Sequence, residues 1–378
     1  MNWAQNRLLW IVDLLLPFSM ALFLLPFDPR LSTLPIAMWL IIQLIAANSS
    51  SKLLQWSWLA LLLFSVREWW FNNPPHPASI IDSLLLISAI VCASTVSPER
   101  WNRLLVLPAF GFLPLVATLS SKPWTPNPFA GANQAAYLLG LIFLIMSIWL
   151  FVRLRGFWLL LAASSLSLLL FIFLWQTGSR AALISAVVSF MFVFVASQIK
   201  KKNFWKSFGF TGIMLIIAYL LRVIFSSNSS LPGFKTGSDV GRLMAYECFA
   251  ALPFTGNNRL VYGVGFDRVS ELCQVEFQGL TLDHAHNLYL QIWASTGILG
   301  VVAIFLIIFS ILRQYYCVRC LMPEPLSLCW QAASVYVLAQ GFFDASLLHW
   351  PLIIIYTGFV VGIPYSFKTL SSQKSLGL

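Results

Sequence analysis

Charged side chains are scarce in this sequence. Only 10% of the 378 residues are Asp, Glu, Lys or Arg, whereas 59% are hydrophobic; soluble globular domains have roughly 25% charged and 45–50% apolar residues. Apolar runs recur along the whole chain and leave no stretch long enough for an independent soluble domain. A soluble enzyme or binding domain is therefore excluded, and we expect one membrane domain over residues 1–378.

Acidic residues are fewer than basic residues. The chain has 13 Asp and Glu against 23 Lys and Arg, which gives a net charge of +10. In a soluble chain this balance would favour nucleic acid. Here the cations lie in short links between apolar runs, where membrane topology explains them better. We therefore expect membrane lipids, and no nucleic acid, as partners.

The apolar runs predict an all-α, polytopic integral membrane protein with about 12 transmembrane helices. The segments cover approximately residues 8–27, 34–47, 53–66, 78–94, 101–119, 135–152, 156–175, 181–199, 207–225, 288–312, 327–347 and 350–367. The first run is too long for the core of a cleavable signal peptide, so we interpret it as a spanning helix.

The positions of the basic residues predict the orientation. If the N-terminus is cytoplasmic, fourteen of the 23 Lys and Arg fall in cytoplasmic segments and only four in the short outer loops. This is the bias that the positive-inside rule describes. We therefore expect both termini on the cytoplasmic side.

One long polar stretch, residues 226–287, interrupts the apolar pattern on the expected outer face. It holds six of the 13 acidic residues, and connections of this length are usually functional or disordered. The apolar spacing within 240–252 predicts an amphipathic helix, and Gly263 and Gly265 predict turns after it. We expect this loop to be ordered and to carry site residues.

Cysteines are few, and their spacing leaves two questions open. Cys317 and Cys320 form one CxxC pair, but a structural zinc site needs a second pair of ligands, which the neighbouring sequence lacks. Cys248 and Cys273 both fall in the outer loop. They either form a disulfide that closes a loop of about 25 residues or are two buried thiols.

Two arginines on the expected outer face are candidates for binding an anion. Arg180 follows Gln176-Thr177-Gly178-Ser179 at a polar break between two apolar runs. It either reaches lipid headgroups at the interface or grips a phosphate with its planar guanidinium. Arg242, at the start of the predicted loop helix, either pairs with Asp239 or Glu247 on a solvated face or joins Arg180 at a shared anionic ligand.

Histidine is also rare, and two of the four lie together at His284 and His286, between Asp283 and Asn287. Histidine suits proton transfer at neutral pH because its ordinary pKa is near 6.5. Side chains two residues apart point in different directions on a helix and share a side only in extended backbone. A metal site would prefer helical spacing of four or supporting carboxylates, so the sequence disfavours a metal here.

These stretches resemble the O-antigen ligase and polymerase superfamily of bacterial membrane glycosyltransferases. The ligase signature is a His followed by Asn, Ser or Gln, nine residues, Gly, two residues and Gly, Thr or Tyr. It is met by His286, Asn287, Gly297 and Gly300. Four further stretches are similar to segments of the family: Thr177-Gly178-Ser179-Arg180, Gly241-Arg242, Gly263-Val264-Gly265-Phe266 and residues 129–137. The chain departs from the family at Ala132-Asn133-Gln134, where Asn-Pro-Asn is common, and at Ala285, where many members carry Ser.

The resemblance implies transfer of a glycan from an undecaprenyl-diphosphate carrier to a hydroxyl of lipid A-core, on the periplasmic face of the bacterial inner membrane. It implies His286 as the catalytic residue and Arg180 and Arg242 as ligands of the diphosphate. Candidate supporting residues are Asp239, Asp283, His284 and Asn287. Neither a cofactor nor a metal is expected.

Two other functions stay open at the level of sequence. A polymerase would use a second lipid-linked glycan, rather than lipid A-core, as the acceptor, although the histidine-to-glycine spacing favours the ligase. A transporter would place ionisable groups near the bilayer midplane and often shows inverted repeats. Here the candidate groups lie on one face, and the acids within or at the edges of spans are Asp13, Asp82 and Asp344.

Overall fold

A computed structural model gives the fold of most of the C-terminal two thirds of the chain. It describes residues 132–153, 179–201, 237–256, 258–277, 280–282, 284–345, 347 and 351–367, together with scattered residues within 86–101 and 165–177. The spans expected at 8–27, 34–47, 53–66 and 207–225, and that at 101–119 apart from Trp101, lie outside the described residues. The predicted number of 12 helices therefore stays a prediction.

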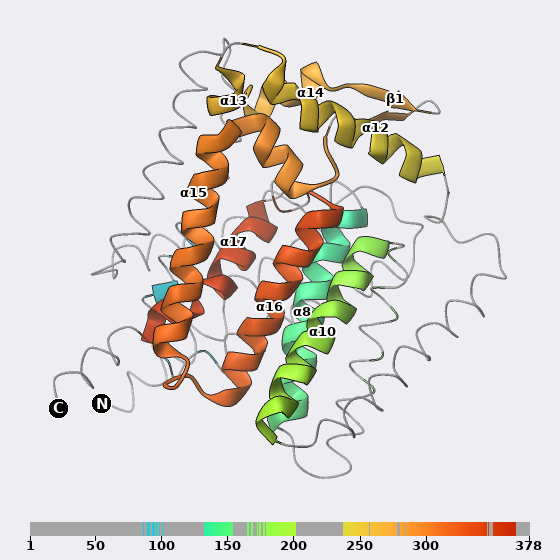
Figure 1. Ribbon diagram of the computed structural model, residues 1–378. Coiled ribbons are helices and arrows are strands. Elements are labelled where there is room, and N and C mark those ends of the chain that lie inside the picture. Colours follow the sequence, from blue (N-terminus) through green and yellow to red (C-terminus); the bar gives the residue numbers. More distant parts are fainter. Residues whose placement is uncertain are drawn as a thin grey trace, which may run out of the picture.

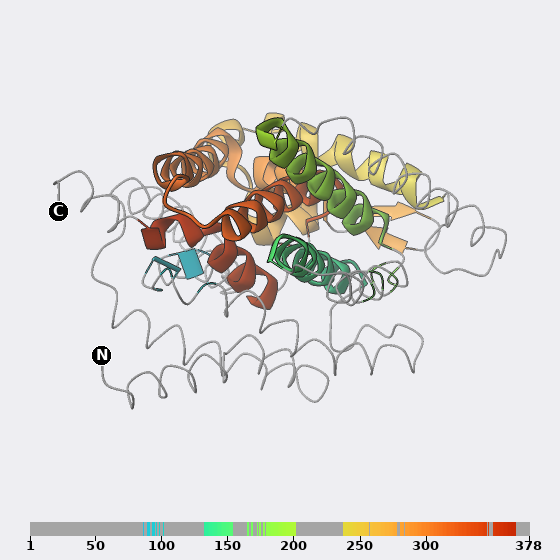
Figure 2. The same cartoon turned by 90° about the horizontal axis from the view of Figure 1, so that it is seen from below.

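Five helices of the described chain form a bundle (Figure 1). They are α8 (Ala132–Arg153), α10 (Arg180–Lys201), α15 (Leu288–Val318), α16 (Glu324–Phe343) and α17 (Pro351–Val361), which is followed by the 3-10 helix η4 (Ile363–Phe367). Viewed along the bundle, α16 lies between α15 and the pair α8 and α10 (Figure 2). Of the described helices, α8, α15 and α16 are long and apolar enough to cross a membrane.

Helices α15 and α16 run antiparallel. Near the start of α15, the Asn287 side-chain amide donates to the carbonyl of Phe342 over 3.0 Å; near its other end, the hydroxyl of Tyr315 lies 3.0 Å from that of Ser327. The first residues of α15 and the last residues of α16 therefore meet at one end of the bundle.

Helix α8 also runs antiparallel to α16. The hydroxyl of Tyr336 donates to the carbonyl of Tyr137 over 3.0 Å, and the thiol of Cys329 lies 3.4 Å from the carbonyl of Ile145. The start of α8 therefore lies at the same end as the last turns of α16.

The predicted spans for α8 and α10 agree with the helices to within three residues, whereas α15 runs six residues past its predicted end at 312 and α16 stops four residues short of 347. The span predicted for 327–347 ends as a helix at Phe343, because Asp344 is extended, with φ −160° and ψ 154°. The oxygen Oδ1 of Asp344 accepts the backbone N–H of Ala345 over 2.9 Å, which stabilises this break. An acidic side chain is thereby released from the helix at the end of the bundle.

Residues 237–287, here called the end lobe, fold over that end (Figure 1). The end lobe contains α12 (Gly237–Ala251), the 3-10 helix η2 (Leu252–Phe254), α13 (Arg259–Tyr262) and α14 (Phe266–Leu272). Its strands β1 (Val275–Phe277) and β2 (Leu280–Leu282) form an antiparallel hairpin with Glu276 opposite Thr281. The helix predicted for 240–252 is confirmed as α12, whereas the hairpin is a small departure from the predicted all-α fold.

The end lobe has an apolar core of its own. Phe249 of α12 and Val269 of α14 are fully buried, and they cluster with Ala285 and with Ala294 of α15. The side chain of Trp293 donates to the carbonyl of Ala250 over 3.2 Å. The first turns of α15 are therefore part of the end lobe's core as well as of the bundle.

A disulfide joins Cys248 of α12 to Cys273 at the end of α14. Of the two alternatives that the sequence leaves open for this pair, the structure has the disulfide. The bond connects the helix that carries Arg242 to the segment that leads into the hairpin and the histidine turn. It therefore restrains α12 relative to the segment that precedes the histidine turn.

Removal of this disulfide is expected to destabilise the end lobe. For a sequence separation of 25 residues, the chain-entropy model gives a loss of about 3 kcal/mol. The measurement is the melting temperature of the detergent-solubilised double variant Cys248→Ala/Cys273→Ala. The control is Cys317→Ala, because Cys317 is an exposed free thiol. Equal melting temperatures for the two variants would contradict the prediction.

Candidate active site

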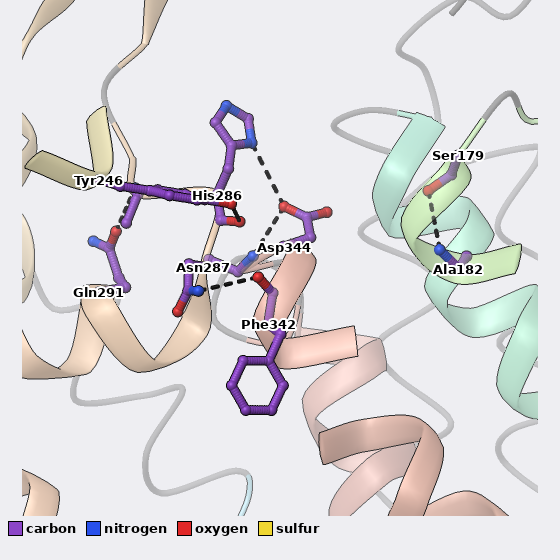
Figure 3. A network of polar contacts seen from close by, with 10 residues as sticks. Ser179, Ala182, Tyr246, His286, Asn287, Gln291, Phe342 and Asp344 are labelled. Atoms are coloured by element: carbon purple, nitrogen blue, oxygen red, sulfur yellow. Dashed lines mark hydrogen bonds and ion pairs between the residues drawn. The ribbon is translucent and has the colours of Figure 1, made fainter. Parts of the chain in front are cut away.

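His286 lies in the turn that joins β2 to α15. Its backbone is left-handed, with φ 47°, a conformation that costs a residue with a side chain roughly 1–3 kcal/mol. Two hydrogen bonds hold the turn: the N–H of Ala285 donates to Oε1 of Gln291 over 2.9 Å, and the hydroxyl of Tyr246 donates to the carbonyl of His286 over 3.3 Å. Contacts from α12 and α15 therefore hold the backbone of this turn (Figure 3).

Asn287 is the N-cap of α15. Its Oδ1 accepts the backbone N–H groups of Tyr289 and Leu290, each over 3.0 Å, and its Nδ2 donates to Phe342 of α16. An N-cap of this kind satisfies amides that the first helical turn leaves without partners. The sequence predicts Asn287 as a supporting residue. Asn287 starts α15 and connects α15 to the end of α16; its supporting role stays a prediction.

Asp344 meets His286 at the end of the bundle (Figure 3). Its Oδ1 lies 3.7 Å from Nδ1 of His286, and the side chains are 4% and 12% exposed, respectively. This separation is longer than a hydrogen bond but short enough for the carboxylate to attract a protonated imidazole. Sequence analysis did not assign Asp344 to the site. The available signal was its position at the end of an apolar span, where a carboxylate needs a partner.

The rings of His284 and His286 are neighbours, with centroids 3.9 Å apart and a tilt of 49° between the planes. The sequence suggests that two such residues share a side only in extended backbone. Here the two rings share a side in a turn in which the backbone of His286 is left-handed. Among the described residues, His284, His286 and Asp344 form the one group of this kind that could hold a metal ion.

The surroundings of His286 lower its pKa from the ordinary 6.5. Burial is the largest cause, because it penalises the charged imidazolium. The carboxylate of Asp344 opposes this effect, whereas His284 and Arg242 add to it. The ring is therefore neutral at neutral pH and has a nitrogen lone pair to accept a proton.

Arg242 belongs to the same end of the molecule. It lies half-buried on α12, and it is close enough to His286 for its positive charge to lower the pKa of that imidazole. The sequence-predicted pair of a histidine and an arginine is therefore brought together by the packing of α12 against α15.

Arg180 is the first residue of α10 and is half-buried. The turn before it is ordered by Thr177, which donates to the carbonyl of Leu174 over 2.7 Å, and by Ser179, whose hydroxyl lies 3.5 Å from the N–H of Ala182. Figure 3 shows this first turn of α10 on the same side of the bundle as Asp344, and α10 packs along α16. The structure thus places Arg180 at the end of the bundle that carries His286.

Two of the predicted supporting residues cannot be placed with their side chains. Asp239 lies in the first turn of α12, where only the backbone is described, and Asp283 lies outside the described residues. Both stay predictions.

Comparison with known families identifies the region that carries this site. Residues 165–305 match the family model described as O-antigen ligase. This region is similar to the O-antigen ligase family. The resemblance predicted from the motifs is thereby confirmed, and it indicates a membrane glycosyltransferase of the O-antigen ligase type. A comparison with curated proteins gives no significant match. Arg180, Arg242 and His286 fall inside the matched region, whereas Asp344 follows it.

The glycines of the ligase signature shape the backbone of this region. Gly297 breaks α15, with φ 62° and ψ −160°, and a Cβ placed there would lie 2.6 Å from the backbone nitrogen of Gly263. The N–H of Gly265 donates over 2.8 Å to the carbonyl of Ser295, just before the break. The backbone around Gly263 and Gly265 therefore lies in close contact with the backbone at Gly297. This contact turns residues 288–296 toward the site.

Gly297→Ala is expected to prevent stable folding of the matched region. The positive φ alone costs roughly 1–3 kcal/mol, and the new methyl group would also overlap the backbone at Gly263. Gly256→Ala is the matched control, because its Cβ would meet the side chain of Arg259 at 3.0 Å rather than backbone. The measurement is the yield and melting temperature of monodisperse protein in detergent. If Gly297→Ala equalled Gly256→Ala in both, this structural role would be wrong.

Proposed function

We propose that the protein transfers a glycan from an undecaprenyl-diphosphate carrier to a hydroxyl of lipid A-core, on the periplasmic face of the bacterial inner membrane. The observation that carries the proposal is the meeting of His286, Asp344 and Arg242 at one end of the bundle, since the first and third lie in the region that is similar to the O-antigen ligase family. A neutral base beside an anion-binding cation is what transfer from a diphosphate leaving group requires.

In the proposed reaction, His286 accepts the proton of the acceptor hydroxyl. Its Nδ1 faces Asp344, so the carboxylate favours the tautomer that carries its proton on Nδ1 and leaves the lone pair on Nε2. The acceptor oxygen gives its proton to Nε2 and forms a bond to the anomeric carbon. The bond from that carbon to the diphosphate oxygen breaks, and direct attack inverts the anomeric configuration.

Arg180 and Arg242 are proposed to hold the diphosphate and the negative charge that grows on it. Guanidinium groups bind phosphate oxygens in a bidentate manner. Two of them supply the positive charge that a divalent cation supplies in other phosphate chemistry, so we propose transfer without a metal. Both lie at the end of the bundle that carries His286.

Three observations support the periplasmic location of this end. A disulfide joins Cys248 to Cys273 in the end lobe, and disulfides persist in oxidising compartments. At the far end of α15, Cys317 and Cys320 are free thiols. The distribution of Lys and Arg along the chain predicts the same orientation.

The test is the analysis of lipopolysaccharide and of lipid-linked glycan in a host without this gene, complemented with the wild-type chain. The proposal predicts that the deletion removes glycan-capped lipopolysaccharide while long polymer accumulates on the carrier. Core that bears a single repeat would instead identify a polymerase. Unchanged amounts of lipopolysaccharide and of lipid-linked glycan would contradict both the ligase and the polymerase activity. The transporter would then be the function to test.

The pH profile of transfer is expected to show that the working form of His286 is the neutral one. Its pKa is lowered from 6.5 by burial, with His284 and Arg242 in the same direction and Asp344 opposed. The rate should therefore keep more than half of its plateau value at pH 6.5, and its acid midpoint should lie below that, where the imidazole becomes protonated. The measurement is kcat/KM against pH. Half of the rate lost at pH 7 or above would contradict the assignment.

A further inference from the structure

The group of His284, His286 and Asp344 has the geometry of an incomplete metal site. Each side chain offers one ligand atom, and these atoms all lie within 4.8 Å of one another. In a tetrahedral site with bonds of about 2.1 Å, ligand atoms stand about 3.4 Å apart. The 3.7 Å between Nδ1 of His286 and Oδ1 of Asp344 is within a few tenths of that value. Small rotations of the side chains would bring the third ligand to the same distance.

A second observation points to a ligand at this place. Nδ1 of His286 is buried and makes no hydrogen bond in the described part of the chain. Buried polar atoms almost always have a partner at hydrogen-bond distance, whereas the carboxylate that faces this atom, that of Asp344, lies 3.7 Å away. The carboxylate of Asp344 is itself held by the N–H of Ala345, in the way that ligating carboxylates are commonly oriented.

The donor set selects the class of ion. Two imidazoles and one carboxylate suit Zn²⁺ and the neighbouring divalent transition metals, whereas Mg²⁺ and Ca²⁺ prefer oxygen ligands alone. The sequence disfavours a metal because the two histidines lack the helical spacing of four; the fold brings a carboxylate, Asp344, to them from the end of α16. The positive charge of Arg242, which acts on His286, opposes a cation. We therefore expect weaker binding than in a structural zinc site.

We propose that Zn²⁺, or a transition metal ion of the same class, binds to His284, His286 and Asp344 and inhibits transfer. The inhibition rests on the proposed function, whereas the binding does not. A neutral imidazole carries one N–H group. A metal ion on Nδ1 of His286 leaves that proton on Nε2, so the ring has no lone pair with which to accept the proton of the acceptor. The ion also occupies the carboxylate of Asp344.

Binding is tested on the purified full chain in detergent, without reference to activity. The background is Cys317→Ser/Cys320→Ser, because these free thiols form a CxxC pair that would also bind zinc. Calorimetric titration with Zn²⁺ should give one site per chain, and His284→Asn should raise the dissociation constant roughly tenfold or more. His76→Asn is the matched control, since it removes an imidazole outside the triad. Equal dissociation constants for the two variants would overturn the proposed site.

Inhibition is then tested with the transfer reaction of the same protein. Zn²⁺ should slow transfer over the concentration range in which it binds, and a chelator should restore the full rate. Transfer that persists at full rate with the site saturated would overturn the inhibition. Transfer that is lost on chelation would overturn it too, because the ion would then be an activator. Binding at the triad in a chain that transfers no glycan would support the site and contradict the proposed function.

Discussion

Transfer by the His286→Asn variant is expected to fall by about 10²–10⁴-fold, the usual contribution of a positioned general base. Asparagine suits the test because it tolerates the left-handed backbone that His286 adopts, with φ 47°. It keeps a polar side chain but cannot accept a proton at neutral pH. The measurement is the initial rate of glycan transfer by the purified variant.

The control for His286→Asn is a measurement of its stability, which shows whether the variant still folds. The hydrogen bonds that hold the turn join the side chains of Gln291 and Tyr246 to backbone atoms. They therefore do not depend on the imidazole. The melting temperature should therefore stay close to that of the wild type. A variant that is equally stable and transfers within tenfold of the wild-type rate would show that His286 is not the base.

Arg180→Ala and Arg242→Ala are each expected to reduce transfer by about 10²–10³-fold, the usual loss when one preorganised donor to a developing anion is removed. Lysine at either position should restore part of the rate, because it keeps the charge but loses the bidentate geometry. The measurement is kcat and KM for the lipid-linked donor. Arg268→Ala is the matched control, since this arginine lies in the same lobe, on α14.

The two arginines should also be coupled. If both hold one diphosphate, the double variant loses less than the product of the two single losses, because residues that act as a unit are not additive. Strictly independent losses, or a loss for Arg268→Ala equal to that for Arg242→Ala, would contradict a shared anion site.

The helices of the described bundle could be predicted because their cause is local. Apolar runs of sufficient length form helices in a membrane whatever their neighbours are. Two helix ends differ from the prediction: α15 continues past 312 to Val318, and α16 stops at Phe343 rather than at 347. Hydropathy does not register this break, because Asp344 stops the helix through its own hydrogen bond to Ala345.

The sequence predicts single residues of the candidate site, but not which residues of different helices contact one another. His286 and Arg242 stand in recognisable motifs, and the packing of α12 on α15 brings them together. Asp344 comes from another helix, and only the antiparallel packing of α15 and α16 shows its partner. The contact of the two histidine rings occurs in a turn with a left-handed residue, which sequence spacing alone does not reveal.

For the glycines and cysteines, too, the sequence identifies the residues, whereas the fold determines their contacts. The signature spacing identifies Gly297 as special, but its close approach to Gly263 depends on how the end lobe folds back on α15. Likewise, the sequence offers Cys248 and Cys273 as either a disulfide or two thiols, and the packing of α12 beside α14 is what brings them within bonding distance.

The most direct test of His286-dependent transfer is reconstitution. The purified chain would be placed in liposomes with an undecaprenyl-diphosphate-linked glycan and lipid A-core, in the presence of a chelator. The wild-type chain should form glycan-capped lipid A-core and release undecaprenyl diphosphate, whereas His286→Asn should form neither. Product at equal rates from both chains would contradict the role of His286. Intact donor and acceptor after incubation with a folded wild-type chain would contradict the transfer itself.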